Sequence, residues 1–597
     1  EELPEKIIQA IKSDTVVKTA YNAQFERVCL SRYLKLPDGE YLNPQSWYCT
    51  AVQAAELALP LSLADVGSVL GLERQKMTEG KELIKYFCVP CKPTKSNGNC
   101  TRNRPCHDIN KWETFKKYCM RDVDVERQIA DKLKMYPISD EEHRLYVLDQ
   151  IINDRGVLVD SELAEQAVKL NSIQTAVAVE QAYMITGLEN PNSVTQLKQW
   201  LKEKGVEIES LSKKSVKSLA DETDGDVSEM LKLRLLMAKT SVKKYEAVIR
   251  SVCSDNRVHG MMRFCGANRT GRWSGNILQP QNLPQNHLPD LTLARDIVKD
   301  GDFEMLDMMF GNVPNVLSEL IRTVLIPKPN HRFIVADFSA IEARVLAWIA
   351  GEQWRIDTFK NGGDIYCASA SKMFKVPVEK HGVNGELRQK GKISELACGY
   401  GGSVGALKNM GAVEMGVQEN ELQGLINDWR NANPHIVRFW YEVGNAAMKA
   451  IKEKTTVPLG KLVFAYERGI LFIRLPSGRR LSYIKPRIGT NRFGGDSITY
   501  MGINSAKKWD RLETFGGKLT ENIVQGTARD LLANALINAA NAGYDTVFHV
   551  HDEIICEVPN GYGSVDELCK LMCIKPEWAD GLPLNADGFE CEYYKKE

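Results

Sequence analysis

The sequence predicts a multi-domain protein of mixed α/β structure, and three observations support this fold class. The chain has 597 residues, more than one hydrophobic core normally organises. Short apolar blocks rich in β-branched residues predict buried strands. Long stretches of helical periodicity lie between those blocks. No apolar run is long enough to predict a membrane span.

The predicted elements follow one another in distinct regions. Residues 1 to about 136 have a mixed α/β pattern, and residues 138–250 are helical and charged. Short strands come next, including one that ends at Asp337. We expect a helical stretch from about 350 to 510 and a final hairpin after it.

The cysteines favour reduced thiols. All fifteen are scattered along the chain, which is typical of a reducing compartment. One group clusters in a basic segment: Cys88, Cys91, Cys100, Cys106 and His107. Its first pair has CxxC spacing, so a structural zinc site stays open. The second half lacks a usual ligand spacing, and free thiols on a loop are the expectation.

Basic residues concentrate in one segment although the chain carries 77 basic and 77 acidic residues. Between Met230 and Ser274, ten basic side chains outnumber two acidic ones. The basic residues are Lys232, Arg234, Lys239, Lys243, Lys244, Arg250, Arg257, Arg263, Arg269 and Arg272. Such an excess predicts contact with a phosphate backbone. A solvated helix face is the alternative.

Two predicted strands carry carboxylates inside apolar runs. Asp337 ends the run 332–336, and Asp552 and Glu553 interrupt the run 547–558. An ionised carboxylate in such a place is costly unless it is paired or binds a metal. Two strands brought side by side could share divalent ions, as two-metal phosphoryl or nucleotidyl transfer requires. The alternative is strand-end carboxylates in solvated turns.

The residues after Asp337 predict how its carboxylate is presented. Ile341, Val345 and Leu346 recur at helical spacing, so the strand ends and a helix follows. The Asp337 side chain and the Phe338 backbone carbonyl are then available to a cation. Oxygen ligands with room for substrate phosphates suit Mg²⁺.

A second candidate group lies at steps of four residues: Arg388, Lys392, Leu396 and Tyr400. On a helix this spacing places the four side chains in one broad stripe. The two cations could bind a triphosphate, and a base could stack near the aromatic ring. An ordinary amphipathic helix with snorkelling basic residues is the alternative.

These motifs together resemble a known family. Asp-Phe-Ser-x-Ile-Glu-x-Arg from Asp337, Arg-x3-Lys-x7-Tyr-Gly from Arg388 and His-Asp-Glu from His551 resemble the three polymerase motifs of family A DNA polymerases. This family is the bacterial DNA polymerase I type, and the residues of these motifs are most similar to those of its phage members. Residues 270–274 with 281–284 resemble the family's primer–template segment, and Gln525-Gly-Thr-Ala its template-contacting helix.

The resemblance implies a right-hand polymerase architecture preceded by a partial ribonuclease-H-like α/β exonuclease domain. We expect the exonuclease-like domain at 1–136 and a thumb with a helical tip at 137–256. The palm is expected at 257–348 and 510–597, and the fingers at 349–509.

The resemblance also implies roles for the catalytic residues. Asp337 and Asp552 would hold two Mg²⁺ ions, with Mn²⁺ as a substitute, together with the Phe338 carbonyl. Glu553 would support them. Lys392 would donate a proton to the leaving pyrophosphate.

Substrate contacts are implied in the same way. Arg388 and Lys392 would bind the dNTP triphosphate, Tyr400 would pack by the nascent base pair, and Glu342 would exclude a 2′-hydroxyl. Leu396 departs from the Phe or Tyr that is usual there, so we predict poor use of dideoxynucleotides. The implied DNA contacts are Arg272, Gln281, Asn282, Gln525 and His551.

The N-terminal region resembles the family's 3′–5′ exonuclease in two motifs only. Asn22 and Glu26 match the second motif, with Glu where Asp is commoner, and Tyr118 and Asp122 match the third. The first motif, Asp-x-Glu on a strand, is not found upstream of Asn22. We therefore expect that the chain starts inside this domain and does not proofread.

The predicted function is template-directed addition of dNTPs to a primer 3′-hydroxyl in DNA replication. We expect primer–template DNA and dNTPs as partners, no membrane association and a monomer, with the replisome partners undefined. The expected location is the bacterial cytoplasm, including that of a phage-infected cell. One alternative is a single-subunit RNA polymerase, which Glu342 disfavours. Another is an inactive DNA-binding protein, which Asp337, Asp552 and Lys392 disfavour.

Overall fold

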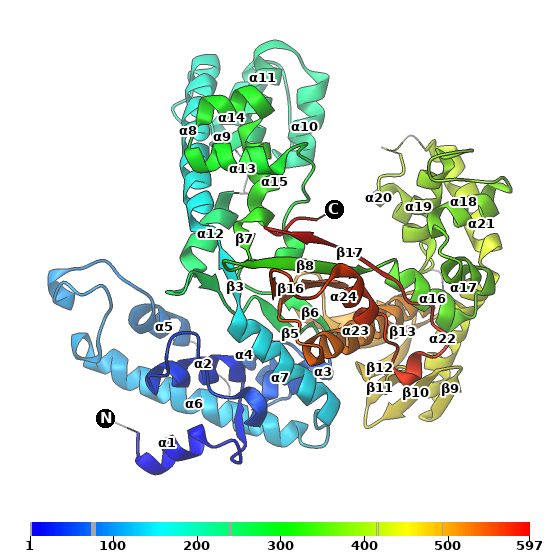
Figure 1. The fold of residues 1–597 in the computed structure, drawn as a ribbon, viewed down its shortest axis with the longest axis horizontal. Coiled ribbons are helices and arrows are strands. Elements are labelled where there is room, and N and C mark those ends of the chain that lie inside the picture. The colour runs from blue at the N-terminus through cyan, green and yellow to red at the C-terminus, as the bar shows by residue number, and fades with distance from the viewer. Residues whose placement is uncertain are drawn as a thin grey trace.

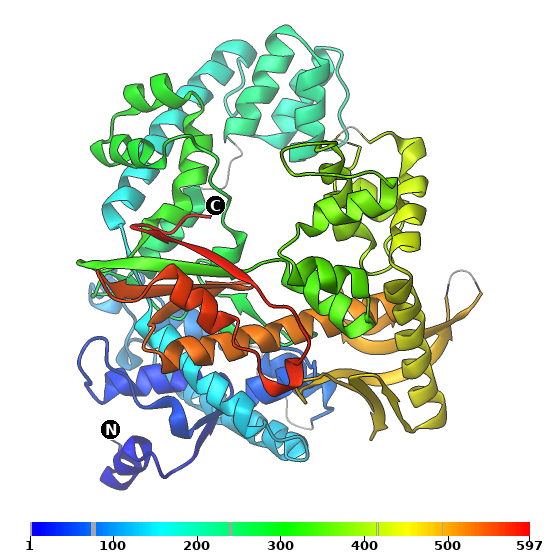
Figure 2. The same ribbon diagram turned by 45° about the vertical axis from the view of Figure 1, so that its right-hand side comes forward.

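A computed structural model describes residues 3–72, 79–237, 242–413, 415, 417–491 and 494–596. An antiparallel sheet lies at the centre, with two helical lobes rising on opposite sides of it and an N-terminal α/β unit beneath (Figures 1 and 2). No helix among the described residues is long and apolar enough to cross a membrane.

The central sheet has four strands in the order β15-β16-β8-β17. They are β8 (His331–Phe338), β15 (Thr546–Val550), β16 (Glu553–Pro559) and β17 (Ala586–Cys591). The two acid-bearing strands predicted from the sequence are thus confirmed as neighbours, β16 beside β8. Consecutive residues on a strand, such as Ile334 and Val335, pack into two different hydrophobic cores. Both faces of the sheet are therefore buried, which explains the continuous apolar runs.

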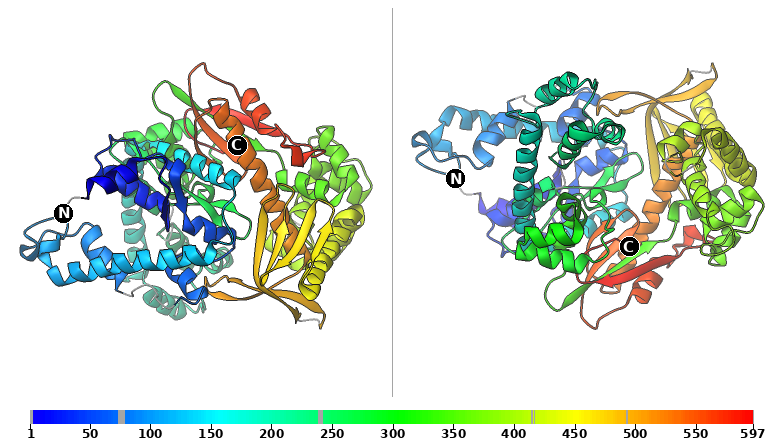
Figure 3. Two further views of the ribbon diagram at one scale, coloured as in Figure 1. Left: turned by 90° about the horizontal axis from the view of Figure 1, so that it is seen from below. Right: turned by 90° about the horizontal axis from the view of Figure 1, so that it is seen from above.

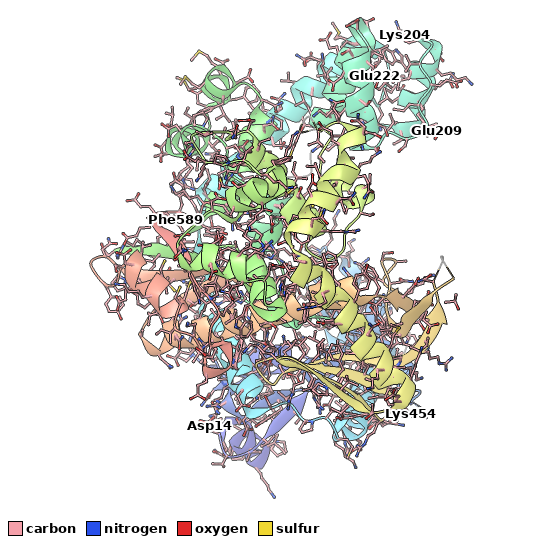
Figure 4. The ribbon with its side chains drawn as sticks, turned by 90° about the vertical axis from the view of Figure 1, so that its right-hand side faces the viewer. Asp14, Lys204, Glu209, Glu222, Lys454 and Phe589 are labelled. Atoms are coloured by element: carbon pink, nitrogen blue, oxygen red, sulfur yellow. The ribbon has the colours of Figure 1, made fainter. Side chains whose placement is uncertain are left out.

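The first helical lobe combines residues from two parts of the chain. Its elements are α8 (Ser161–Thr186), α9 (Val194–Glu203), α10 (Lys213–Glu222), α11 (Gly225–Met237), α12 (Val242–Ser251), α13 (Leu291–Asp300), α14 (Phe303–Phe310) and α15 (Val313–Leu320). Helix α7 (Asp140–Arg155) lies outside this lobe and packs against β15 of the central sheet. Helices α9–α11 form the tip of the lobe, marked by Lys204 and Glu222 in Figure 4. A small sheet of β3 (Val157–Val159), β4 (Arg257–Val258) and β7 (Leu325–Ile326) joins this lobe to the centre.

The second helical lobe follows β8. It contains α16 (Ile341–Ala350), α17 (Gln353–Lys360), α18 (Ile365–Phe374), α19 (Leu387–Cys398), α20 (Val404–Asn409), α21 (Leu422–Ala432) and α22 (Pro434–Glu453). Helix α16 begins three residues after Phe338, which confirms the strand-to-helix transition predicted there. Helices α23 (Gly516–Asn541) and α24 (Val565–Met572) pack on one face of the central sheet.

The prediction of helix up to residue 510 is wrong beyond α22. Residues 456–514 form a six-stranded antiparallel sheet in the order β14-β13-β12-β11-β10-β9. Its strands are β9 (Thr456–Leu459), β10 (Leu462–Glu467), β11 (Ile470–Arg474), β12 (Arg480–Thr490), β13 (Asp496–Ile503) and β14 (Trp509–Thr514). Gly460, Gly469 and Gly478 have positive φ at the turns between the first four strands, which glycine adopts at little cost. These turns interrupt the helical pattern.

The six-stranded sheet joins the second lobe to the N-terminal unit. Phe464 and Leu471 pack with α22 and α23. Ile470 and Phe472 instead pack with Val125 and Ile129 of the N-terminal unit. Figure 3 shows the sheet beside that unit from below. Contact on both sides fixes its position.

The N-terminal unit is the mixed α/β region that the sequence predicts. It contains α1 (Glu5–Lys12), β1 (Lys18–Ala20), α2 (Ala23–Tyr33), β2 (Trp47–Cys49), α3 (Thr50–Glu56), α4 (Leu63–Val69), α5 (Gly80–Cys88) and α6 (Ile109–Leu133). Its sheet consists of the parallel pair β1 and β2.

The cysteine-rich segment of this unit has no metal-like geometry. The described side chains of this segment include no group of three His, Cys, Asp or Glu placed to share a metal ion. The Cys91 Sγ instead accepts a hydrogen bond from Asn97 Nδ2 at 3.3 Å. In this segment Cys88 and Cys106 are exposed free thiols, and Cys91 and Cys100 are half-buried ones.

Candidate active site

The acids predicted from the sequence meet at one end of the central sheet. Glu553 is directly opposite Asp337 in the register of β16 and β8. Asp552 occupies the turn before β16, and its carbonyl accepts a hydrogen bond from the Phe338 N–H at 3.2 Å. Residues in register on adjacent strands project to the same face of a sheet. The structure therefore brings Asp337, Phe338, Asp552 and Glu553 together.

The electrostatics of these acids reflect burial and mutual repulsion. Burial raises the pKa of Asp552 to about 7, with Arg272 opposing the shift and Asp337 adding to it. Burial also raises the pKa of Asp337, and Lys596 opposes that shift. Clustered carboxylates that resist ionisation gain when a cation joins them.

A cation from the chain's last described residues already touches this cluster. The Lys596 ammonium lies 3.1 Å from Glu553 Oε2 and 3.4 Å from Asp337 Oδ2. The Tyr594 hydroxyl donates to Glu553 Oε1 at 2.7 Å. Sequence reasoning missed both residues, since they belong to no motif and reach the site only because the chain turns back after β17.

The donor set fits a divalent metal that substrate helps to coordinate. Two carboxylates and a main-chain carbonyl are hard oxygen ligands, and Mg²⁺ typically takes one or two carboxylates, with water and substrate phosphates completing its octahedron. Lys596 shows that a positive charge is accommodated beside Asp337.

The predicted nucleotide-binding stripe lies on α19 and just beyond it. Arg388, Lys392 and Leu396 are on this helix, and Tyr400 follows its end. The Leu396 side chain is exposed. Arg388 donates from Nε and Nη2 to Asp364 Oδ2 at 2.9 and 2.8 Å. Its guanidinium is thus held by an acid that the sequence analysis did not identify.

Glu342 connects the nucleotide side of the site to the DNA side. The Tyr400 hydroxyl donates to Glu342 Oε2 at 2.7 Å. Arg272, on β6 (Arg272–Gly275), donates to Glu342 Oε1 at 2.5 Å. Burial and the Glu342 charge raise the pKa of Tyr400. Three segments far apart in the sequence are therefore tied through one carboxylate.

The candidate DNA contacts divide into two groups. Arg272, Gln281 and His551 line one small cavity of about 40 Å³ together with Asp552. Gln281 Oε1 is buried there without a hydrogen-bond partner. Two further candidates, Asn282 and Gln525, do not line this cavity.

A buried ion pair, also missed by sequence reasoning, supports the Arg272 strand from behind. Arg529 of α23 donates to both carboxylate oxygens of Glu142 at 2.6 and 2.7 Å. Its Nε donates to the Gly271 carbonyl at 3.0 Å, and its guanidinium lies 4.8 Å from the Trp273 ring. The partners are 387 residues apart, so no local pattern reveals them.

The basic segment 230–274 is only partly available to a polyanion. Arg234, Arg257, Arg269 and Arg272 bond to protein groups. Lys232, Lys243, Arg250 and Arg263 are exposed. Lys239 lies outside the described residues. The phosphate-footprint prediction therefore depends on the second group.

The exonuclease-like motifs converge only in part. Asn22, Glu26 and Asp122 line a cavity of about 920 Å³, joined by Glu126 of α6, which sequence reasoning missed. Burial and the Glu126 charge raise the pKa of Glu26 to about 7. Tyr118 is absent from that lining. Instead its ring stacks on Phe115 at 5.9 Å between centroids.

Several known proteins are similar to this chain in sequence. The sequence model of DNA polymerase family A matches residues 161–573. The DNA polymerase of Bacillus phage SP02 is 52% identical over 598 residues, covering 100% of this chain and 92% of the phage protein. The thermostable DNA polymerase I of Thermus aquaticus is 27% identical over 265 residues, which is 43% of this chain and 27% of that enzyme.

A solved structure shares the architecture. It is the POL domain of Pol1 from M. smegmatis in complex with DNA primer-template and dNTP, with a TM-score of 0.62 and 19% identity. The match covers 99% of this chain and 89% of that one. The likeness confirms the predicted polymerase fold. With the family match over residues 161–573 and the phage relative, it shows that the chain belongs to DNA polymerase family A.

Proposed function

We propose that this DNA-directed DNA polymerase extends a primer by nucleotidyl transfer at the end of the central sheet, with Asp337 and Asp552 as the shared metal ligands. The observation that carries the proposal is the pairing of β8 with β16, which puts Glu553 opposite Asp337 and Asp552 beside Phe338. Glu553 supports the two ligands. Template-directed DNA synthesis is the activity of the family.

Family A polymerases depend on divalent metal, and the oxygen donors here suit Mg²⁺, with Mn²⁺ as a substitute. Two such ions, when bound, would activate the primer 3′-hydroxyl and stabilise the charge on the leaving pyrophosphate. The protein's part is to hold Asp337, Asp552 and the Phe338 carbonyl at fixed positions on adjacent strands.

The nucleotide is bound from the α19 side. Arg388 and Lys392 bind the triphosphate, and Lys392 gives its proton to the pyrophosphate as it leaves. Arg388 exchanges its ion pair with Asp364 for the incoming phosphates, since both anions compete for one guanidinium. Tyr400 packs by the nascent base pair. Leu396, without a hydroxyl, contributes to poor use of dideoxynucleotides.

Sugar selection and DNA binding depend on the segments that Glu342 links through Tyr400 and Arg272. Glu342 blocks the space of a 2′-hydroxyl, and its two hydrogen bonds from Tyr400 and Arg272 support a fixed position for this carboxylate. The minor-groove side of primer and template meets Arg272, Gln281, Asn282 and Gln525. His551 lies at the primer end.

We also propose domain boundaries: thumb at 137–256, palm at 257–348 and 510–597, and fingers at 349–509. The N-terminal unit, residues 1–136, does not proofread. Two helices, α2 and α6, provide its carboxylates, and neither β1 nor β2 carries an acid. The relatives support primer-template DNA and dNTPs as partners, and the phage relative supports replication in an infected bacterium. A monomer is the proposed working form.

The test is primer extension with purified protein, dNTPs and Mg²⁺. We expect template-dependent extension by the wild type and loss of it in Asp337→Asn. Glu342→Ala should raise ribonucleotide incorporation, which separates this proposal from an RNA polymerase. Neither the RNA polymerase nor an inactive DNA-binding protein finds support in the comparisons. Normal extension by Asp337→Asn would refute the proposed site.

A further inference from the structure

The segment after β17 returns to the acids at the end of the central sheet. Tyr594 is fully buried and donates from its hydroxyl to Glu553 Oε1 at 2.7 Å. Two residues later, the Lys596 backbone N–H donates to Asn286 Oδ1 at 3.1 Å. These bonds on either side of Lys595 anchor the segment and direct the Lys596 ammonium toward the acids.

The ammonium bridges two acids that otherwise repel each other. It lies 3.1 Å from Glu553 Oε2 and 3.4 Å from Asp337 Oδ2. Glu553 is almost fully buried, so its charge is poorly solvated. Lys596 is thus a cation located where negative charge is concentrated.

We propose that Lys596 is the counter-ion of the catalytic carboxylates in the metal-free enzyme, and that it competes with divalent metal for Asp337. This inference rests on the proposed function, in which Asp337 is a metal ligand. Lys596 is a positioning residue, because it acts through Asp337 and Glu553.

The distances make competition unavoidable. Mg²⁺ binds carboxylate oxygens at about 2.0–2.1 Å. A metal on Asp337 Oδ2 would therefore lie within roughly 5–6 Å of the ammonium, where two positive charges repel strongly. The flexible lysine stem lets the ammonium withdraw, which costs its two ionic contacts. The affinity of the protein for metal is therefore lower in the absence of nucleotide. The phosphates of a bound nucleotide add negative charge and so favour full occupancy of the metal sites.

Direct metal binding tests the inference. Mn²⁺ would be titrated into the full chain without DNA or nucleotide and followed by electron paramagnetic resonance. We expect Lys596→Met to bind Mn²⁺ about tenfold more tightly, which corresponds to about 1.4 kcal/mol. In EDTA the same variant should melt about 1–2 °C lower, because Asp337 and Glu553 lose their cation. Lys596→Arg should keep the wild-type behaviour in both measurements.

A neighbouring lysine provides the matched control. The Lys595 ammonium lies 5.5 Å from the Phe589 ring, and Lys595→Met should leave Mn²⁺ affinity unchanged. Equal or weaker Mn²⁺ binding by Lys596→Met would overturn the inference. Asp337→Asn separates the two levels: unchanged Mn²⁺ binding in that variant would mean that Asp337 is no metal ligand, and the proposed function would fail instead.

Discussion

The chain gathers carboxylates at two places, and the backbone presents them differently. In the central sheet, Asp337 and Glu553 face each other on paired strands. In the N-terminal unit, Glu26 and Asp122 come from helices α2 and α6 and line a cavity of about 920 Å³. Pairing between strands fixes the separation of opposite side chains, whereas two helices around a cavity impose no such spacing.

Counter-charge separates the two places further. Lys596 lowers the pKa of Asp337 against the effect of burial. The pKa of Glu26 is raised to about 7 by burial and by the nearby charge of Glu126. Burial raises the pKa of Asp552 to about 7 as well, so a raised pKa by itself does not distinguish the two places. The features that distinguish the central acids are strand pairing and the lysine that contacts both Asp337 and Glu553.

The largest expected effect tests which cluster supports synthesis. Asp337→Asn or Asp552→Asn should slow primer extension about a thousandfold or more, roughly 4 kcal/mol, because a charge-stabilising group is lost. Glu26→Gln and Asp122→Asn should extend primers at the wild-type rate. Asp587 also pairs with Asp337, from β17, and Asp587→Asn is the matched control within the sheet. If substitutions in both clusters slowed primer extension equally, the prediction that the central acids alone support synthesis would be wrong.

The second prediction concerns the contact that links α7 to the central region. Arg529→Met should lower the free energy of unfolding by about 3 kcal/mol, because Glu142 is left buried without its partner. Urea unfolding measures the change. The Arg529→Met and Glu142→Leu double variant should recover part of it. Arg144→Met, which removes an exposed pair with Glu141 on the same helix, should change the stability by less than about 0.5 kcal/mol.

The third prediction examines the departure from the family pattern on α19. Leu396→Tyr should improve dideoxynucleotide incorporation about tenfold, because its hydroxyl can replace a hydrogen bond that the missing 3′-hydroxyl cannot make. Leu396→Phe, which adds the ring without the hydroxyl, should gain much less. The ratio of kcat/KM for dideoxy and deoxy substrates measures this effect. Equal gains in both variants would attribute it to the ring.

The smallest expected effect is a pH dependence in the N-terminal unit. The pKa of Glu26 is higher in the folded protein, about 7, than the ordinary value near 4.3. The folded state therefore binds the proton more tightly, and its stability should fall as the pH rises from about 4.5 to 7. In Glu26→Gln this loss of folding stability should be smaller by on the order of 1 kcal/mol, after allowance for solvent screening. Parallel stability curves for both proteins would show that Glu26 is not perturbed.

Local sequence patterns predicted the acid-bearing part of the fold well. Asp337 and Asp552 interrupt apolar runs, and strands buried on both faces produce such runs. The start of α16 follows from the periodicity of Ile341 and Val345. Both signals are carried by neighbouring residues, so no tertiary information is needed.

Two kinds of feature were missed. Residues 456–514 form strands whose core-facing residues alternate, as Leu471 and Ile473 do on β11. This alternation is a local signal for strands that the expectation of helix overlooks. Arg529 with Glu142, and Lys596 with Asp337, pair across hundreds of residues. No local rule identifies such partners.

The most direct test of the central claim is a crystal structure with primer–template, dNTP and Mn²⁺, in which anomalous scattering locates the metal. The account predicts two Mn²⁺ ions that share Asp337 and Asp552, with ligand distances of about 2.0–2.5 Å, and an ammonium of Lys596 that has moved away from Asp337. Mn²⁺ bound elsewhere, or carboxylates too far apart to share an ion, would contradict it.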